Sequence, residues 1–399
     1  MPELAERIRE SVRHQHFEII ASLKQLVEVN SHSRNYDGIN RVGDMVARFM
    51  PGILHRRIIT DRNSVKHLIF AGSELNGKPV VLIGHTDTVF PPDSKFQNFM
   101  EVGDRIHGPG TSDMKGGIVV MVFALRVLDE LGLLGTIPIR CLVNGDEEIG
   151  SPHSLPMIKE VARDASFGLV FECGGLEGEV VYARRGIRRF KLTVTGKARH
   201  AGVKEGPKDS AIVELSRMIL ALEDLNDPEK GVSINVGKIS GGTDTNVVPD
   251  NATALFEFRF WDGETERAVL DRIGKIVNNP DNPQCTAKYK CDHQRPAGCP
   301  VDGTDELFSL VKNAAKDLQQ TLGKERRGGT SDANFLTNMG IPTLDGLGPV
   351  GDLDHSPEEY ILKQSLFERI ELTALVLARL GGQANDRSSA TEPRGKRRL

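Results

Sequence analysis

Cysteine is scarce in this chain of 399 residues, and its few copies follow no regular spacing. They are odd in number and include no Cys-x-x-Cys pair: Cys141, Cys173, Cys285, Cys291 and Cys299. A disulfide scaffold and a zinc finger both require a regular cysteine pattern. We therefore expect a reduced, cytoplasmic protein with free thiols.

Long apolar runs and a strong charge of one sign are also missing. Residues 1–30 carry charges throughout, which is typical of an amphipathic helix and leaves no apolar stretch for a signal peptide. No other window is long and apolar enough to span a bilayer. The formal net charge of −4 gives no reason to expect nucleic acid as a partner. We expect neither a membrane nor a nucleic acid among the partners.

The composition that remains is that of a soluble globular protein, with 39% hydrophobic and 27% charged residues. A chain of 399 residues is too long for a single core. Two domains are the natural expectation.

The first candidate site residues follow a buried strand. Residues 80–83 are four consecutive apolar residues, three of them β-branched, which predicts a strand buried on both faces. His85 and Asp87 follow at its carboxyl end, and side chains two apart in an extended segment project to the same side. Asp87 can therefore hold one nitrogen of His85 while the other faces a metal. Taken alone, a His-x-Asp pattern is more often an ordinary polar loop.

Carboxylates follow further elements of the chain. Asp113 lies in a glycine-rich turn before an apolar helix, where a helix N-cap is the commonest role for aspartate. Strand 137–143 leads to the acidic turn 146–148, and strand 167–171 ends in Glu172. A solvated turn is the common alternative, but like charges packed at the edge of a core need a cation to offset them. Because ligands of an open α/β sheet bind at the carboxyl ends of its strands, we expect a site there.

The pattern changes from residue 188. Alternating and helical segments follow in the order βαββαβ, which is the ferredoxin-like unit. Residues 187–295 are therefore predicted to form a compact domain inserted into a larger one, which consists of residues 1–186 and 296–381.

The last part of the chain returns to the first domain. His355 precedes Ser356-Pro-Glu-Glu359, which carries three helix-start signals, so we expect His355 in a loop at a helix N-terminus. A histidine in a surface loop without a role is the alternative. Residues 382–399 are polar and short of apolar anchors, which predicts a disordered tail whose basic end is solvated.

Together these residues resemble the M20 peptidase family, the dinuclear zinc peptidases of the carboxypeptidase G2, acetylornithine deacetylase and aminoacylase group. The matching motifs, in chain order, are Gly-His-Thr-Asp (84–87), Gly-x-Gly-x-x-Asp-Met-Lys-Gly-Gly (108–117), Asp-Glu-Glu-x-Gly-Ser (146–151), Glu172 and Asp-His-Ser (354–356). The resemblance implies a mixed-sheet α/β catalytic domain with an inserted ferredoxin-like α+β lid domain. It also implies a homodimer, and the lid offers an edge strand and an exposed helix face for this contact.

The resemblance further implies two zinc ions per subunit, for which Co²⁺ or Mn²⁺ can substitute. It assigns His85 and Glu172 to one ion, Glu148 and His355 to the other, and Asp113 to both. Two zinc ions, three carboxylates and one hydroxide sum to zero charge, a tolerable state for a cleft. Glu147 resembles the general base of the family, and Asp87 would orient His85.

The resemblance points to five further residues, four of them in the inserted domain and one, Gly329, after it. His200 matches the lid histidine that stabilises the oxyanion in the family. Asn246 and Arg259 match positions that bind the substrate carboxylate, Gly329 lies in the matching glycine turn, and Arg295 resembles a further family arginine. A loop histidine near a dimer interface and an ordinary solvated strand arginine are the alternatives for His200 and Arg259.

Glutamate at position 172 resembles the carboxypeptidase and deacylase branch of the family rather than the aminopeptidases. The stretches Arg184–Gly186 and Asp146–Ser151 resemble the glutamate carboxypeptidases most. The leading hypothesis is a zinc hydrolase that cleaves an amide next to a free α-carboxylate, on a peptide or small-molecule substrate. An N-acyl-amino-acid deacylase, of the acetylornithine deacetylase or aminoacylase type, is the alternative enzyme. A non-catalytic binding protein on the same fold is the third reading, against which the intact Glu147 and the complete ligand set argue.

Overall fold

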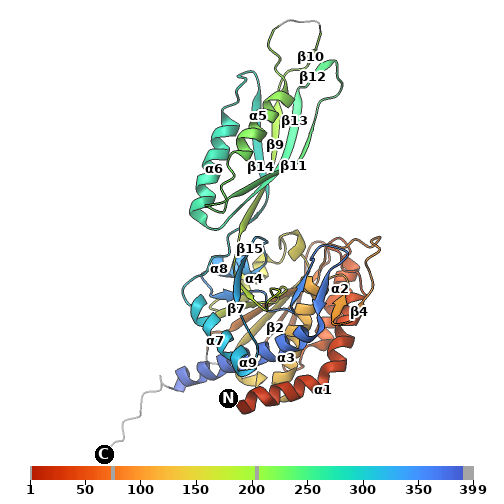
Figure 1. The fold of residues 1–399 in the computed structure, drawn as a ribbon, viewed down its shortest axis with the longest axis vertical. Helices are drawn as coiled ribbons and strands as arrows, with labels where there is room; N and C mark the ends of the chain where they lie inside the picture. Colours follow the sequence, from red (N-terminus) through yellow and green to blue (C-terminus); the bar gives the residue numbers. More distant parts are fainter. Residues whose placement is uncertain (1, 73–76, 203–205, 390–399) are drawn as a thin grey trace, which may run out of the picture. The chain divides into compact units, whose positions relative to one another are not determined.

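The computed structural model describes residues 2–72, 77–202 and 206–389, which form two compact units. Unit 1 comprises Met1–Tyr182, Pro300–Arg326 and Ser331–Leu399, and unit 2 comprises Ala183–Cys299 and Arg327–Thr330 (Figure 1). The predicted insert, residues 187–295, falls inside unit 2. The additional turn Arg327–Thr330 belongs to unit 2 although it comes later in the chain.

A six-stranded mixed sheet forms the centre of unit 1. Its strands lie in the order β1 (His55–Thr60), β2 (Lys66–Ala71), β6 (Ile139–Asn144), β3 (Val80–His85), β7 (Phe167–Val170) and β16 (Thr343–Leu344). The pairs β1–β2 and β2–β6 are antiparallel, and the other pairs are parallel. All six residues of β3 are buried, as its apolar run predicts for a central strand.

Helices cover both faces of this sheet (Figure 1). One face packs against α1 (Pro2–Val27), α2 (Tyr36–Phe49), α3 (Gly116–Glu130), α7 (Thr304–Asp317) and α9 (Lys363–Ser389). The other face packs against α4 (Leu155–Val161) and α8 (Ala333–Asn338). The side chains of β3 divide accordingly, because Leu82 packs in the first core while Val81 and Ile83 pack in the second. This is the mixed α/β fold that the sequence predicts.

Short elements complete unit 1. A four-stranded sheet has the order β17 (Gly351–Asp352), β18 (Tyr360–Leu362), β5 (Arg105–His107) and β4 (Met100–Val102). Strands β8 (Val180–Arg184) and β15 (Lys324–Arg327) pair with each other, and their last residues belong to unit 2. The short helices of unit 1 are η1 (Thr111–Lys115), η2 (Leu134–Thr136) and η3 (Glu147–Ile149).

The predicted helix start at Ser356 is wrong. Residues 356–359 form a turn, β18 follows, and helix α9 begins only at Lys363. The capping signals are overridden because Glu359 is buried and accepts backbone hydrogen bonds from another loop, and because Ile361 pairs with Ile106 of β5. His355 therefore lies in a loop between two short strands.

The predicted end of regular structure at Gly382 also differs from the structure, because α9 continues to Ser389. The double glycine reads as a helix stop, yet a Cβ at Gly381 would lie 2.7 Å from Ile137 Cγ1, so the glycine serves close packing inside the helix. Residues 390–399 of the predicted tail lie outside the described residues. Along the described part of the chain, no helix has the length and apolar character that a membrane crossing requires.

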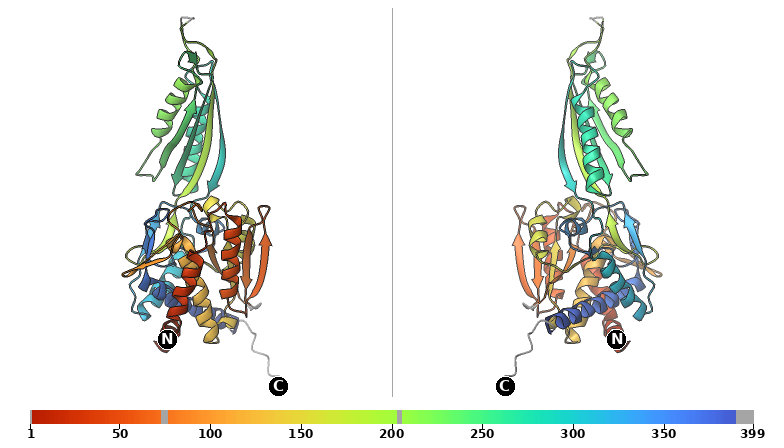
Figure 2. Two further views of the ribbon diagram at one scale, coloured as in Figure 1. Left: turned by 90° about the vertical axis from the view of Figure 1, so that its right-hand side faces the viewer. Right: turned by 90° about the vertical axis from the view of Figure 1, so that its left-hand side faces the viewer.

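Unit 2 follows the order β9 (Gly186–Thr195), α5 (Ala211–Glu223), β11 (Ser233–Gly241), β13 (Asn251–Phe260), α6 (Gly263–Asn278) and β14 (Thr286–Arg295). The strands form an antiparallel sheet in the order β11-β13-β9-β14, the ferredoxin-like arrangement that the sequence predicts. Both helices pack on one face of the sheet (Figure 2). The short strands β10 (Arg199–His200) and β12 (Val247–Val248) pair with each other.

Candidate metal centre

Three neighbouring strands of unit 1 bring their carboxyl ends to one edge of the sheet. His85 is the last residue of β3, and its Cα partner across the ladder is Asn144, the last residue of β6. The acidic turn 146–148 therefore begins beside His85. On the other side of β3, strand β7 ends at Val170, so Glu172 reaches the same edge. The parallel register places these side chains together, as we expect from the sequence.

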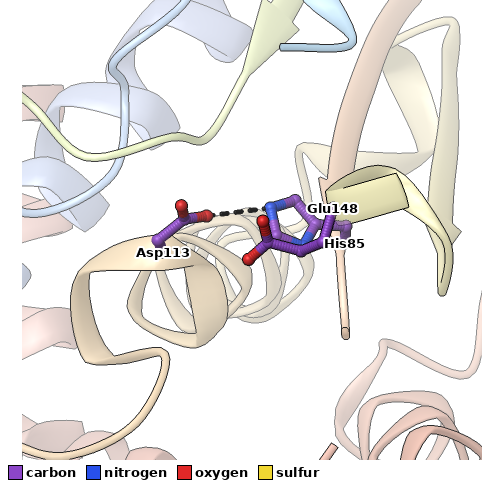
Figure 3. Close-up of side chains that lie close together, drawn as sticks. All are labelled: His85, Asp113 and Glu148. Atoms are coloured by element: carbon purple, nitrogen blue, oxygen red, sulfur yellow. Dashed lines mark hydrogen bonds and ion pairs between the residues drawn. The ribbon is translucent and has the colours of Figure 1, made fainter. Parts of the chain in front are cut away.

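Asp113 stands between two histidines. Its Oδ1 lies 3.0 Å from Nε2 of His85, and its Oδ2 lies 3.2 Å from Nε2 of His355. Figure 3 shows the carboxylate of Asp113 aimed at the ring of His85, with Glu148 beside them. The carboxylate is therefore arranged to serve two positions, one with each oxygen.

Each histidine also faces a second carboxylate. Nε2 of His85 lies 3.6 Å from Oε1 of Glu172, and Nε2 of His355 lies 3.4 Å from Oε2 of Glu148. The structure thus brings all five predicted ligands together, and it pairs them as the resemblance implies. His85, Glu148 and Glu172 have buried side chains, whereas His355 is half exposed.

The electrostatics of this cluster favour a cation. Burial raises the pKa of Glu172 to about 8, and the negative charge of Asp113 adds to the shift. Burial and the same charge raise the pKa of Glu148 well above its ordinary value. Burial also opposes the charge of Asp113, but hydrogen bonds from His355 and His85 hold its pKa well below the ordinary range. Several acids share one buried space, so positive charge there lowers the free energy of their ionised forms.

The donor atoms fit a divalent transition metal. Imidazole nitrogens and carboxylate oxygens are the ligands that zinc takes in catalytic sites. Oε1 of Glu148 is buried and has no hydrogen-bond partner among the described residues, which leaves it available for coordination. Candidate ligand atoms within 4.8 Å of one another occur in two groups: His85, Asp113 and Glu148, and His85, Glu147 and Glu172.

Asp87 ties the end of β3 to the acidic turn. Its carboxylate accepts hydrogen bonds from the backbone N–H groups of Glu147 and Glu148, at 3.1 and 3.2 Å, and from the hydroxyl of Ser33 at 3.0 Å. Its Oδ1 lies 3.4 Å from Nδ1 of His85, and its carbonyl oxygen lies 3.0 Å from the same nitrogen. Asp87 is fully buried and therefore fixes the ring of His85 together with the turn that carries Glu147.

Sequence reasoning missed Glu359, which supports the loop of Asp113. Its carboxylate is fully buried and accepts the backbone N–H groups of Gly110, Ser112 and Asp113. The only sign of this role in the sequence is an acidic residue shortly after His355. The adjoining Ser-Pro favours a helix start instead, and a glutamate in the first turn of a helix needs no further explanation. Asp332 was missed as well, and it accepts hydrogen bonds from Asn144 and from Ser151 beyond the acidic turn.

In unit 2 the predicted residues form two separate groups. His200 and Asn246 lie in the paired segments around β10 and β12, where Ala201 N–H donates to the Asn246 carbonyl at 2.8 Å. The His200 side chain is exposed, and its Nδ1 accepts the Gly202 N–H at 3.1 Å.

The second group surrounds Arg259. Its Nη1 donates to the carbonyl oxygen of Gly328 at 2.8 Å, beside Gly329, and its Nε donates to Oε1 of Glu257 at 2.9 Å. Arg295 is buried and lies in the same cross-strand row, because Arg259 and Arg295 both oppose Ile187. At the other end of β13, Asn251 follows β12, which pairs with the segment of His200. About eight residues of strand, or about 26 Å, therefore separate the two groups.

Comparison with known proteins agrees with this architecture. Residues 81–379 match the model of "Peptidase family M20/M25/M40". The chain is 28% identical over 374 residues to carboxypeptidase G2 from Pseudomonas sp. (strain RS-16), which covers 91% of this chain and 89% of that protein. It is also 28% identical over 316 residues to succinyl-diaminopimelate desuccinylase from Stutzerimonas stutzeri, with 73% and 79% covered.

A solved structure shares the fold. The YXEP protein of Bacillus subtilis, described as a dinuclear metal binding peptidase from the M20 family, superposes with a TM-score of 0.69. The match covers 92% of this chain and 99% of that one, at 15% sequence identity.

Proposed function

Because the chain belongs to peptidase family M20/M25/M40 and is therefore a metallohydrolase, we propose that it is a dinuclear zinc enzyme that cleaves an amide bond next to a free α-carboxylate. The reaction closest to this proposal is that of a glutamate carboxypeptidase. The similarity to carboxypeptidase G2 along most of both chains supports it. Co²⁺ or Mn²⁺ can take the place of zinc in a site of this donor set.

The observation that carries the proposal is the position of Asp113. Its two oxygens face two different histidines, and each histidine nitrogen faces one more carboxylate. A bridging carboxylate with two separate ligand pairs is the arrangement that two metal ions require. His85 and Glu172 would hold one ion, and Glu148 and His355 would hold the other.

The proposed metal ions and the residues around them have different roles in the hydrolysis. Metal ions bound there would polarise the substrate carbonyl and favour deprotonation of the attacking water. Glu147 takes the proton from that water as the new C–O bond forms, and delivers it to the leaving nitrogen as the C–N bond breaks. Asp87 keeps Glu147 and His85 in register through its backbone and side-chain contacts.

The residues of unit 2 are proposed to bind the substrate. Arg259 would pair with the free α-carboxylate, aided by Arg295 and the Gly329 turn, because a guanidinium matches a carboxylate with two hydrogen bonds. Asn246 and His200 would contact the scissile group, with His200 donating to the developing oxyanion. His200 pairs with β12, which precedes β13, whereas Arg259 lies near the far end of β13. Because of this separation, we propose that His200 acts in the site of a second subunit.

A deacylase is the second candidate. The similarity to succinyl-diaminopimelate desuccinylase favours it, because that name describes removal of an acyl group from an amino acid derivative. Both candidates break an amide bond to the nitrogen of an amino acid. They differ in the group on the carbonyl side, which is a peptide for the carboxypeptidase and a simple acyl group for the deacylase. The cytoplasmic location and the homodimer stay predictions.

A metal analysis followed by a substrate panel tests the proposal. The purified protein should hold up to two zinc ions per chain, and the Asp113→Ala variant should lose both because Asp113 serves both. The panel should pair peptides that end in glutamate with N-acetyl- and N-succinyl-amino acids. Faster cleavage of C-terminal glutamate amides would support the carboxypeptidase, and preference for N-acyl-ornithine or N-succinyl substrates would support the deacylase. Two tightly bound ions in Asp113→Ala would contradict the bridging role.

A further inference from the structure

Glu359 is a buried carboxylate that the proposed hydrolysis does not use. Its Oε1 accepts the N–H of Ser112 at 2.8 Å and that of Asp113 at 3.1 Å, and its Oε2 accepts the N–H of Gly110 at 3.2 Å. All three donors belong to the loop that carries the bridging residue Asp113. Three backbone N–H groups therefore depend on one buried side chain, and losing it would leave them without these partners, so Glu359 holds this loop in place.

The segment that carries Glu359 also carries His355. Residues 353–359 connect β17 to β18, and the pairing of Asp352 with Tyr360 closes this loop at its base. Glu359 is therefore the last residue of the same loop in which His355 is presented to Asp113. One short segment supplies a candidate ligand of the second ion and the support for the bridging ligand.

The backbone of this segment needs such support. Leu353 and His355 have φ angles of +61° and +63°, in the left-handed region that residues with a Cβ rarely adopt. Conformations of this kind persist only where surrounding contacts hold them. The His355 side chain is half exposed, so packing around it contributes little. Glu359 connects the two loops through three backbone hydrogen bonds, in addition to the contact between His355 and Asp113.

Lys115 shares the buried surroundings of Glu359. Its side chain is fully buried and donates to the carbonyl oxygen of Val29 at 2.9 Å. Burial lowers the pKa of Lys115 to about 7 and raises the pKa of Glu359 to about 8, although the backbone hydrogen bonds to Glu359 favour its ionised form. Glu359 thus combines complete burial with three directed contacts beside the candidate metal centre.

We propose that Glu359 is a positioning residue that fixes the separation between Asp113 and His355, and so determines how tightly the second metal ion binds beside the first. This inference rests on the metal centre of the proposed function but not on its substrate. It assigns Glu359 no contact with substrate or metal. Its effect passes through the backbone of residues 110–113 and through the loop 353–359.

The test compares Glu359→Gln, Glu359→Ala and the matched control Glu358→Gln. Glu358 is adjacent and exposed, so the control removes one charge from the same loop without touching the Asp113 loop. The glutamine keeps an oxygen for Ser112 and Asp113 but turns an NH₂ group towards the N–H of Gly110. Zinc affinity is measured by competition with a chelator, and the cobalt-loaded proteins are compared by visible absorption, which reports coordination geometry.

We expect Glu359→Gln to bind the second zinc ion at least about tenfold more weakly than the wild type and to change the cobalt spectrum. Glu359→Ala should show a larger loss, and Glu358→Gln should match the wild type. A purely structural role would lower the thermal stability of the metal-free variants but leave the affinity and the spectrum of the folded protein unchanged.

Wild-type affinity for both ions and an unchanged spectrum in a folded Glu359→Gln variant would overturn the inference. If Glu359→Ala does not fold, the glutamine variant decides the result. A wild-type protein that binds no zinc or cobalt would reject the metal centre itself, and this inference with it. Two bound ions without cleavage of any amide in the panel would instead count only against the proposed substrate.

Discussion

At the scale of single residues, two adjacent glutamates have the same side chain but different surroundings, and these surroundings suit them to different roles. Glu147 and Glu148 are adjacent in the sequence, yet Glu148 contacts His355 and has an unpartnered buried oxygen, which suits a ligand. Glu147 lies near His85 and Glu172. We assign the proton transfer to Glu147 because its neighbour is already committed to His355.

The first prediction follows from this assignment. Glu147→Gln keeps the size of the side chain but removes its ability to take a proton, so turnover should fall by orders of magnitude. Metal content should stay at the wild-type value, since the proposed ligands are unchanged. Steady-state kinetics and metal analysis measure both quantities, with Glu177→Gln, an exposed glutamate, as the control. Turnover near the wild-type rate would show that another group acts as the base.

The second prediction concerns recognition of the substrate carboxylate. Arg259→Ala should raise KM for substrates with a free α-carboxylate and should affect the matching carboxamides little, because these lack the charge. Arg189→Ala is a matched control, since Arg189 lies on the neighbouring strand and also pairs with Glu257 but does not contact the Gly328 turn. Equal losses for both kinds of substrate would indicate a folding defect rather than recognition.

The sequence indicates the ligand candidates by their positions in short motifs or directly after apolar strands. The structure brings these five residues, His85, Asp113, Glu148, Glu172 and His355, into one cluster. Glu359 could not be predicted in this way, because its partners are backbone N–H groups of a loop almost 250 positions away. In the sequence, Glu359 is indistinguishable from a solvated glutamate. Only the folded chain distinguishes a buried carboxylate from an exposed one.

At the scale of elements, periodicity predicts the long segments and fails for the short ones. The alternating pattern of residues 187–295 predicts the long strands of the sheet in unit 2. The apolar run at residues 80–83 predicts the central strand of the sheet in unit 1. Strands β4, β5, β17 and β18 have two or three residues each, too few for an alternation to be read. The turn before β18 carried helix-capping residues, and tertiary pairing with β5 prevailed over them.

The third prediction concerns helix α9. Burial raises the pKa of Glu371 to about 7; Arg9 opposes this shift and Glu368 reinforces it. The folded state therefore binds this proton more tightly than the unfolded chain, whose glutamate has an ordinary pKa near 4.5. The contribution to stability is fully present below about pH 4.5 and is lost as the pH rises to about 7.

Glu371→Gln removes this titration. The variant should melt at a higher temperature than the wild type at pH 8, and the difference should shrink as the pH is lowered towards 5. Thermal unfolding across this range measures the effect, and Glu10→Gln, an exposed glutamate of α1, is the control. A constant difference at all pH values would mean that packing, not ionisation, separates the two proteins.

At the scale of the whole molecule, the proposed active site needs residues from two chains. The fourth prediction tests this with two inactive variants, His200→Ala and Glu147→Ala, mixed under conditions that allow subunits to exchange. If His200 acts in its neighbour's site, each heterodimer has one complete site, and random exchange restores roughly a quarter of the wild-type activity. If His200 acts within its own chain, every site keeps one defect. Verified exchange without recovery would refute the shared site.

The way unit 2 is inserted also sets an order of events during synthesis. Most of unit 2 is one continuous stretch, Ala183–Cys299, and its ends are held together by two hydrogen bonds of 2.9 Å between Arg184 and Gly298. The core of unit 1 instead joins α1, α3 and α9, which come from both ends of the chain. The ferredoxin-like unit can therefore fold while the ribosome is still producing the rest. Unit 1 cannot complete its core before α9 has been synthesised. Until then, its first helices have an apolar face exposed to solvent, and a chaperone would bind them at this stage.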